Sequence, residues 1–229
     1  MRRERSLHGI RVGATGGPTN EEGWTSEKEA VRNVRADELR QVAAVIARAF
    51  YDDPPTCWTL PNDEQREILL SRGLYFYLRK LWFPQGECLT TPGVVGAATW
   101  LPPGGWKVSP IRQVFLLPGL ALAFGRSTGR VLSAIASMES NQPEVEHFYL
   151  PFAGVLPEWQ GKGIGSALLS PVLQRCDRDA IPAYLEASSP LNRRLYERHG
   201  FEVTEEFRFA QGAPPLWRMW RSPRPVRED

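Results

Sequence analysis

Three glycines at alternate positions mark the segment Gln160-Gly161-Lys162-Gly163-Ile164-Gly165-Ser166-Ala167. It follows a predicted strand that ends at Val155 and leads into a predicted helix over residues 163–176. Glycines at this spacing are a poor start for a helix unless the backbone has to pass close to a ligand. The unpaired N–H groups of a first helical turn and the helix dipole favour an anion at such a place. The sequence therefore predicts a loop that binds a diphosphate.

Two other nucleotide-binding patterns fit this loop less well. A Walker loop needs Ser or Thr directly after its lysine, whereas Gly163 follows Lys162. A Rossmann loop gains support from Glu186, which lies about 20 residues further on at the end of a predicted strand. However, residues 156–160 separate the preceding strand from the first glycine, and too little chain follows to complete two nucleotide-binding halves. A dinucleotide-binding protein is therefore the weaker interpretation.

Hydrophobic periodicity on both sides of the loop predicts an α/β (α+β) fold. Alternating strands and helices of ordinary length are typical of a mixed sheet that is covered by helices. The predicted strands cover residues 31–34, 87–90, 94–101, 146–155, 183–187, 201–209 and 216–221. The predicted helices cover 39–50, 63–81, 111–124, 131–138, 163–176 and 191–199.

The same patterns predict the domain organisation. We expect one domain over residues 30–221, with a helical insertion at about 106–142. Residues 1–29 are rich in Gly, Glu, Arg, Ser and Thr, which predicts a disordered leader, and residues 222–229 are expected to form a flexible tail.

Composition excludes several classes of protein. The 229 residues are 42% hydrophobic and 24% charged, as in folded globular domains. A net charge of +2 is too balanced to indicate nucleic acid or an anionic membrane as the main partner, so neither is expected, although it leaves room for a local basic cleft. Three widely spaced cysteines indicate neither disulfides nor a metal site, and they fit a reducing cytoplasm. We therefore expect a cytoplasmic monomer or homodimer without a metal.

The loop and the sequence around it resemble the GCN5-related N-acetyltransferase (GNAT) family. Gln160-x-x-Gly163-x-Gly165 matches the Q/R-x-x-G-x-G/A signature of that family, and Asn192-x-x-x-Tyr196 follows in the family's order. The resemblance spans about residues 30–221 and extends to the puromycin N-acetyltransferase subgroup, which Asp53-Pro54 also echoes. It implies a mixed, mostly antiparallel central sheet, flanked by helices, in which the fourth and fifth strands splay apart.

This resemblance also implies acetyl-CoA as co-substrate. Asn192 would contact the pantetheine arm, and Tyr196 would protonate the departing thiolate. Both residues share one face of a predicted helix because they are four positions apart. Pro151 cannot donate a strand hydrogen bond, so a bulge is expected there. The implied cofactor-binding residues are Phe152, Ala153, Gly154 and Val155 for pantetheine and Gln160, Gly161, Lys162, Gly163, Ile164, Gly165 and Ser166 for the pyrophosphate.

The general base is left open among three residues. Glu186 is favoured by the resemblance, whereas Glu146 and His147 are favoured by their position at the mouth of the predicted splayed strand. Any of the three side chains has the chemistry to accept a proton from an ammonium group.

The aromatic residues Trp58, Tyr75, Tyr77 and Trp106 are candidates for an acceptor pocket, with packing in the core as the alternative.

We therefore expect an acetyl-CoA-dependent N-acetyltransferase that acts on a primary amine of a small molecule. A puromycin-like aminonucleoside is the most specific expectation, with a role in antibiotic resistance or detoxification. A protein N-acetyltransferase and a non-catalytic acyl-CoA sensor are the alternatives.

Overall fold

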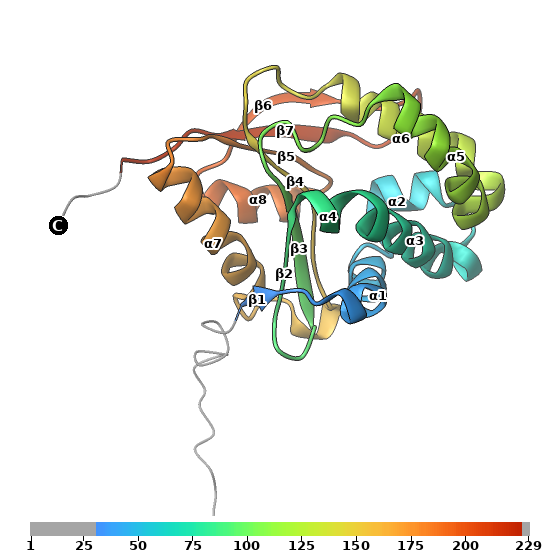
Figure 1. Cartoon of the computed structure of the whole chain (residues 1–229), viewed down its shortest axis with the longest axis horizontal. Helices are drawn as coiled ribbons and strands as arrows, with labels where there is room; N and C mark the ends of the chain where they lie inside the picture. The colour runs from blue at the N-terminus through green and yellow to red at the C-terminus, as the bar shows by residue number, and fades with distance from the viewer. Residues whose placement is uncertain (1–30, 226–229) are drawn as a thin grey trace, which may run out of the picture.

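A seven-stranded mixed sheet forms the centre of the computed structural model, which describes residues 31–225 (Figure 1). The predicted leader over residues 1–29 and the end of the predicted tail lie outside the described residues. The strand order is β1-β2-β3-β4-β5-β7-β6, and β4 and β5 are parallel while the other neighbours are antiparallel. The strands are β1 Arg32–Asn33, β2 Glu87–Thr90, β3 Gly96–Leu101, β4 Phe148–Val155, β5 Ala183–Ala187, β6 Glu202–Phe207 and β7 Leu216–Arg221.

Helices cover both faces of the sheet. Figure 1 shows α7 and α8 on one side and α1, α3 and α5 on the other. Apolar residues of β3 point to both faces of the sheet. Ala97 packs with α1 and α3, whereas Ala98 and Trp100 pack with α7. The helices are α1 Leu39–Ala49, α2 Pro54–Thr59, α3 Asp63–Tyr77, α4 Phe83–Gln85, α5 Pro110–Phe124, α6 Thr128–Ser140, α7 Ile164–Arg178 and α8 Pro190–Arg198.

The helix predicted over residues 63–81 is longer and less regular in the structure. α3 continues into a π-helical turn over Leu78–Trp82 before α4 begins. The sequence does not predict the short helix α2, because Pro54 and Pro55 indicate only a stop after the helix predicted over residues 39–50. In the structure Pro54 stands at the first position of α2, where a missing N–H group costs no hydrogen bond.

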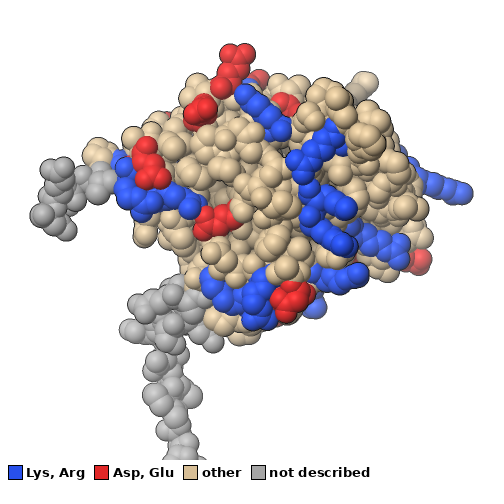
Figure 2. All heavy atoms as spheres, viewed as in Figure 1, with Lys and Arg blue, Asp and Glu red and all other residues tan. Residues whose placement is uncertain are grey.

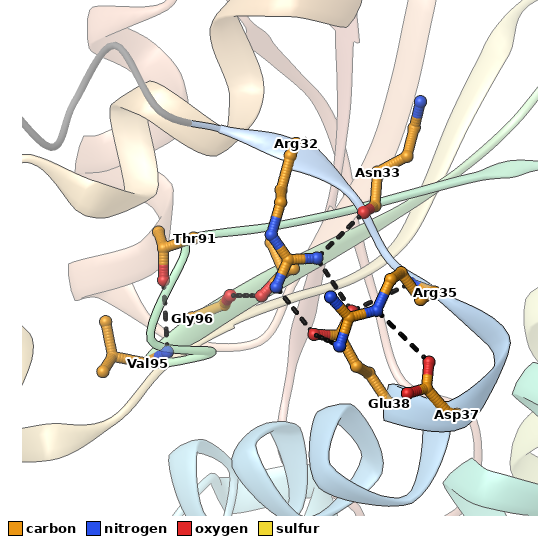
Figure 3. Close-up of polar contacts among 9 residues, drawn as sticks. Arg32, Asn33, Arg35, Asp37, Glu38, Thr91, Val95 and Gly96 are labelled. Carbon is orange, nitrogen blue, oxygen red and sulfur yellow. Dashed lines mark hydrogen bonds and ion pairs between the residues drawn. The ribbon is translucent and has the colours of Figure 1, made fainter.

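Polar contacts fix how the described chain enters the fold (Figure 3). Arg32 of β1 donates two hydrogen bonds, of 2.8 and 2.7 Å, to the carboxylate of Glu38, which also accepts the backbone N–H of Arg35 at 2.9 Å. The Arg32 hydrogen bonds and the backbone N–H lower the pKa of Glu38 to about 2. Across the β2–β3 turn, the hydroxyl of Thr91 accepts the backbone N–H of Val95 at 3.1 Å. These contacts anchor the edge of the sheet next to α1.

The predicted bulge and splay both occur in β4. Thr99 lies opposite Phe152 and Leu101 lies opposite Tyr149, so β4 contains one residue more than β3 across this interval. Leu150 and Pro151 together lie opposite the single residue Trp100, and Pro151 has no N–H group to donate to the ladder. β4 pairs with β5 only at Phe148 and Tyr149 and runs free of it from residue 150 onward. The sheet therefore opens along the second half of β4.

Candidate active site

The glycine loop adopts the backbone expected of an anion-binding turn. Gly161 has φ +76° and Gly163 has φ +83°, a left-handed region that strains residues with a side chain. Gly163 is the N-cap of α7, so the N–H groups of Ile164, Gly165 and Ser166 begin a helix and have no carbonyl of their own helix to bond. These donors and the helix dipole fit a pyrophosphate.

Side chains attach this loop to the end of β4. The Gln160 side chain donates a hydrogen bond of 3.0 Å to the carbonyl oxygen of Val155. The Lys162 ammonium lies 4.4 Å from the centre of the Trp159 ring, and the Ser166 hydroxyl lies 2.9 Å from Nε2 of His199. The Gln160 hydrogen bond thereby holds the loop beside the free half of β4, as one elongated ligand would require.

The free half of β4 offers backbone groups along one edge. Residues 152–155 pair with β3 on one side, whereas the side toward β5 has no ladder. An extended ligand with amide groups can add to such an edge by backbone hydrogen bonds. Gly154 is explained by packing, because a Cβ there would lie 2.9 Å from the Cβ of Ala49 in α1.

A cavity of about 230 Å³ lies beside the splay. Its apolar wall combines aromatic residues with residues of α3, α5 and α6, and its lining contains neither Lys nor Arg. Three carboxylate side chains reach it, those of Asp53, Glu139 and Glu186. The aromatic lining residues are Phe50, Tyr77, Trp82, Trp106, Phe124, Tyr149, Phe152 and Tyr196, and the remaining polar ones include Gln142, Ser188 and Asn192.

Glu186 is held at this cavity by a partner from the neighbouring strand. The Tyr149 hydroxyl donates to one carboxylate oxygen at 2.9 Å, and the Gln142 side chain donates to the other at 3.5 Å. Burial raises the pKa of Glu186 to about 7, and the Tyr149 hydrogen bond opposes that rise. A carboxylate with a pKa near neutrality can accept a proton at physiological pH.

A second buried carboxylate, Asp53, belongs to the same cavity. The Ser188 hydroxyl donates to Asp53, and the Asn192 side chain donates to the Ser188 oxygen at 3.2 Å. Burial raises the pKa of Asp53 to about 6. Sequence reasoning assigned no role to Asp53 or Ser188. A usable signal was an acid placed directly before Pro54-Pro55, the first residues of α2.

Tyr196 and Asn192 both line the cavity from α8, as their four-residue spacing predicts. Tyr196 is buried and packs edge-to-face on Phe201, with the ring centres 6.0 Å apart. Burial is the first cause of the raised pKa of Tyr196, and the nearby charge of Asp53 adds to it. The Tyr196 hydroxyl therefore holds its proton in the free protein.

The three candidate bases do not meet at the cavity. Glu146 is exposed and is not among the lining residues, and His147 is fully buried behind them. The His147 ring stacks on Trp106, with Nδ1 2.6 Å from the Val145 carbonyl oxygen and Nε2 3.1 Å from Oε1 of Gln142. His147 thus lies behind the lining residues Trp106 and Gln142, which leaves Glu186 as the candidate base on the cavity wall.

Two of the four aromatic residues that the sequence offers for an acceptor pocket line the cavity, and two do not. Tyr77 and Trp106 line the cavity, whereas Trp58 and Tyr75 do not. Trp58 packs edge-to-face on Phe209 at 5.2 Å, and the Tyr75 ring lies under the Arg40 guanidinium.

Within residues 31–225, no three His, Cys, Asp or Glu side chains gather where a metal could bind, and none of the described helices has the length and apolar character needed to cross a bilayer.

Comparisons with known proteins agree with this geometry. The acetyltransferase (GNAT) domain model matches residues 111–216. An uncharacterised N-acetyltransferase of Schizosaccharomyces pombe is 28% identical over 184 residues, which are 75% of this chain and 74% of that protein. A Corynebacterium glutamicum structure described as histone acetyltransferase HPA2 and related acetyltransferase shares 23% identity over 86% of this chain and 97% of its own, with a TM-score of 0.66. Arylalkylamine N-acetyltransferase 2 of Aedes aegypti is 12% identical, with coverages of 84% and 97% and a TM-score of 0.55.

The family signature therefore coincides with the observed pyrophosphate-type loop, the bulged β4 and the splayed β4–β5 pair. Residues 111–216 match the GNAT acetyltransferase domain, and the protein is an acetyltransferase whose co-substrate is acetyl-CoA.

Proposed function

We propose that this enzyme acetylates the primary amine of a small molecule whose body is apolar and partly aromatic. The cavity carries the proposal, because it combines buried carboxylates and aromatic walls with the absence of Lys and Arg from its lining. An ammonium group is favoured near carboxylates, and a flat apolar body is favoured against aromatic rings. A puromycin-like aminonucleoside has both features, and so has an arylalkylamine, the substrate class in the name of the Aedes aegypti relative.

Residues of the glycine loop and β4 bind acetyl-CoA in this proposal. The N–H groups of residues 161–166 hold the pyrophosphate, and the free edge of residues 152–155 pairs with pantetheine. A backbone N–H of the same edge polarises the thioester carbonyl as negative charge develops on its oxygen. Asn192 adds an amide contact at the end of this groove.

Glu186 and Tyr196 supply the two proton transfers. Glu186 accepts a proton from the ammonium, and the free amine nitrogen then forms a bond to the acetyl carbon. As the carbon–sulfur bond breaks, Tyr196 donates its proton to the departing sulfur. The nitrogen then loses its second proton to solvent, the Tyr196 phenolate recovers a proton from solvent, and Glu186 releases the proton that it accepted. The products are an acetamide, free coenzyme A and one proton. Asp53, held by Ser188, stabilises the ammonium before it loses its proton.

Thiol release from acetyl-CoA, measured across a panel of amines, tests the proposal. The panel contains puromycin, phenylethylamine, tryptamine, agmatine, spermidine and a lysine-containing peptide, with products identified by mass. We expect turnover with puromycin or the two arylalkylamines and a mass gain of one acetyl group. Turnover restricted to the peptide would overturn the small-molecule assignment, whereas no turnover with any amine would remove the proposed substrate class altogether.

A further inference from the structure

The helix α5 is apolar on two opposite sides. Toward the protein it buries Leu120, Ala123 and Phe124, and α3 approaches so closely that a Cβ on Gly119 would lie 2.2 Å from the Phe76 ring. Its outer side exposes Phe115 to 79% and Leu122 to 84%. A helix that is apolar all round is normally covered on every side. Over the described residues 31–225, nothing covers the outer side of α5.

The exposed apolar residues form one continuous face. Ile111, Val114, Phe115, Pro118 and Leu122 recur at three- and four-residue spacing, so they lie on the same side of the helix. With 15 residues, α5 is about 22 Å long, which is too short to cross a bilayer but long enough to lie along its surface. Contiguous exposed apolar surface of this kind marks an interaction site.

Positive charge surrounds this face. Residues 106–138 contain Lys107, Arg112, Arg126 and Arg130 and no acidic residue, a local charge of +4 in a chain whose total is +2. All four side chains are exposed, and none forms an ion pair with another residue of the described range. Figure 2 shows uncharged surface over α5 with Lys and Arg side chains along its border.

We propose that the outer face of α5 docks on an anionic phospholipid surface, with the apolar residues at the level of the acyl chains and the four cations at the headgroups. Amphipathic helices with Lys and Arg beside a Phe- and Leu-rich face bind membranes in this way. A second copy of the chain is disfavoured as the occupant, because a symmetric contact would bring two patches of +4 together.

The end of α5 also forms part of the cavity wall. Phe124 at the end of α5 and Val131, Ala134, Ile135 and Met138 of α6 form one of its walls. The wall of the cavity is therefore directly connected to the helix that contacts lipid, and an apolar amine dissolved in the membrane would be delivered beside it. The lipid contact itself does not depend on which amine the enzyme acetylates.

Flotation of the full-length protein with lipid vesicles tests the proposal. The vesicles contain phosphatidylcholine alone or with one third phosphatidylglycerol, at low and at high salt. We expect binding to the anionic vesicles, loss at high salt, and binding that is about tenfold weaker in the Phe115→Ser/Leu122→Ser double variant and in Arg126→Glu. Val145→Ser, which changes a 61% exposed apolar residue elsewhere, is the matched control and should bind like the wild type.

Two outcomes would overturn the proposal. One is equal flotation with neutral and anionic vesicles, or no flotation with either. The other is a dimer, measured by light scattering on a sizing column, that the Phe115→Ser/Leu122→Ser variant dissociates, because a second copy would then cover α5. Acetyl-CoA binding, followed by thermal shift, should be equal in all variants and shows that each one is folded.

Discussion

The Tyr149 hydroxyl donates a 2.9 Å hydrogen bond to Glu186 at the point where β4 and β5 part. Tyr149 belongs to the last paired position between these strands, opposite Tyr184, and Glu186 lies two residues beyond that pair. The splay that opens the sheet for a ligand therefore also places a carboxylate at the cavity. The bulge at Leu150 and Pro151, which interrupts the β3–β4 ladder, directly follows the last residue of β4 that pairs with β5.

Glu186→Gln should lower turnover by about a hundredfold or more, because the amide cannot accept a proton from the ammonium. The pKa of Glu186 is about 7, so in the wild type kcat/KM should rise with pH through this value as the carboxylate ionises. The measurement is the pH–rate profile of both proteins with a fixed amine. Acetyl-CoA affinity serves as the control and should not change. A wild-type ascending limb that persists in Glu186→Gln would assign the base to another group.

Tyr149→Phe should move that ascending limb to higher pH. The Tyr149 hydroxyl stabilises the ionised carboxylate, so its removal leaves burial less opposed and raises the pKa of Glu186 further. The rate at pH 6 should fall more than the rate at pH 9. Tyr75→Phe changes a tyrosine outside the cavity lining and is the matched control. A uniform drop at all pH values would mean that Tyr149 acts only through packing.

Tyr196→Phe should lower kcat while leaving acetyl-CoA affinity nearly unchanged. The ring still fills its place against Phe201, but the proton for the departing sulfur is gone. We expect a decrease of about a hundredfold in kcat. Steady-state kinetics together with equilibrium binding of coenzyme A separate the two effects. Equal turnover in wild type and variant would show that another group, or water, protonates the thiolate.

The sequence predicts the part of the site that depends on local backbone, but not the part that depends on contacts between distant segments. The loop at Gly161 and Gly163, the interruption at Pro151 and the shared face of Asn192 and Tyr196 follow from residue type and spacing. The Asp53–Ser188 contact joins residues 135 positions apart, and no periodicity reports such a pair.

Burial explains two further differences between sequence and structure. Glu146 and His147 are adjacent in sequence just before β4, yet Glu146 is exposed while His147 is fully buried, because its ring packs against Trp106 and two other aromatic rings. Similarly, Pro54 and Pro55 looked like the end of α1, although they also begin α2. In each case a local pattern fits two conformations, and tertiary packing decides between them.

Gly163→Ala should weaken acetyl-CoA binding much more than it destabilises the fold. A Cβ at φ +83° costs about 1 kcal/mol of backbone strain and shifts the N–H groups that begin α7. Gly104→Ala is the matched control, because Gly104 also has a positive φ and open space for a Cβ but lies outside the loop. Both variants should lose similar thermal stability, and Gly163→Ala alone should lose the thermal shift caused by acetyl-CoA. An equal shift in both would remove this loop as the pyrophosphate site.

Glu186→Gln should also stabilise the fold, increasingly as the pH rises. The folded-state pKa of Glu186, about 7, lies above the ordinary value of 4.5, so between these values the folded chain keeps a proton that the unfolded chain has lost. The stability associated with this group is therefore complete at acidic pH and is lost as the pH rises through 7. That loss amounts to roughly 3 kcal/mol, and glutamine avoids it because it has no charge to bury.

Urea unfolding of both proteins at pH 5 and at pH 8 measures this difference. The variant should nearly match the wild type at pH 5 and should have the higher free energy of unfolding at pH 8. Asp53→Asn should behave in the same sense, with a change that is complete near pH 6, because burial raises the pKa of Asp53 as well. A stability difference that does not change with pH would mean that Glu186 is not desolvated in solution. A difference that grows with pH would show that the carboxylate is kept at the cost of stability, as expected of a group retained for proton transfer.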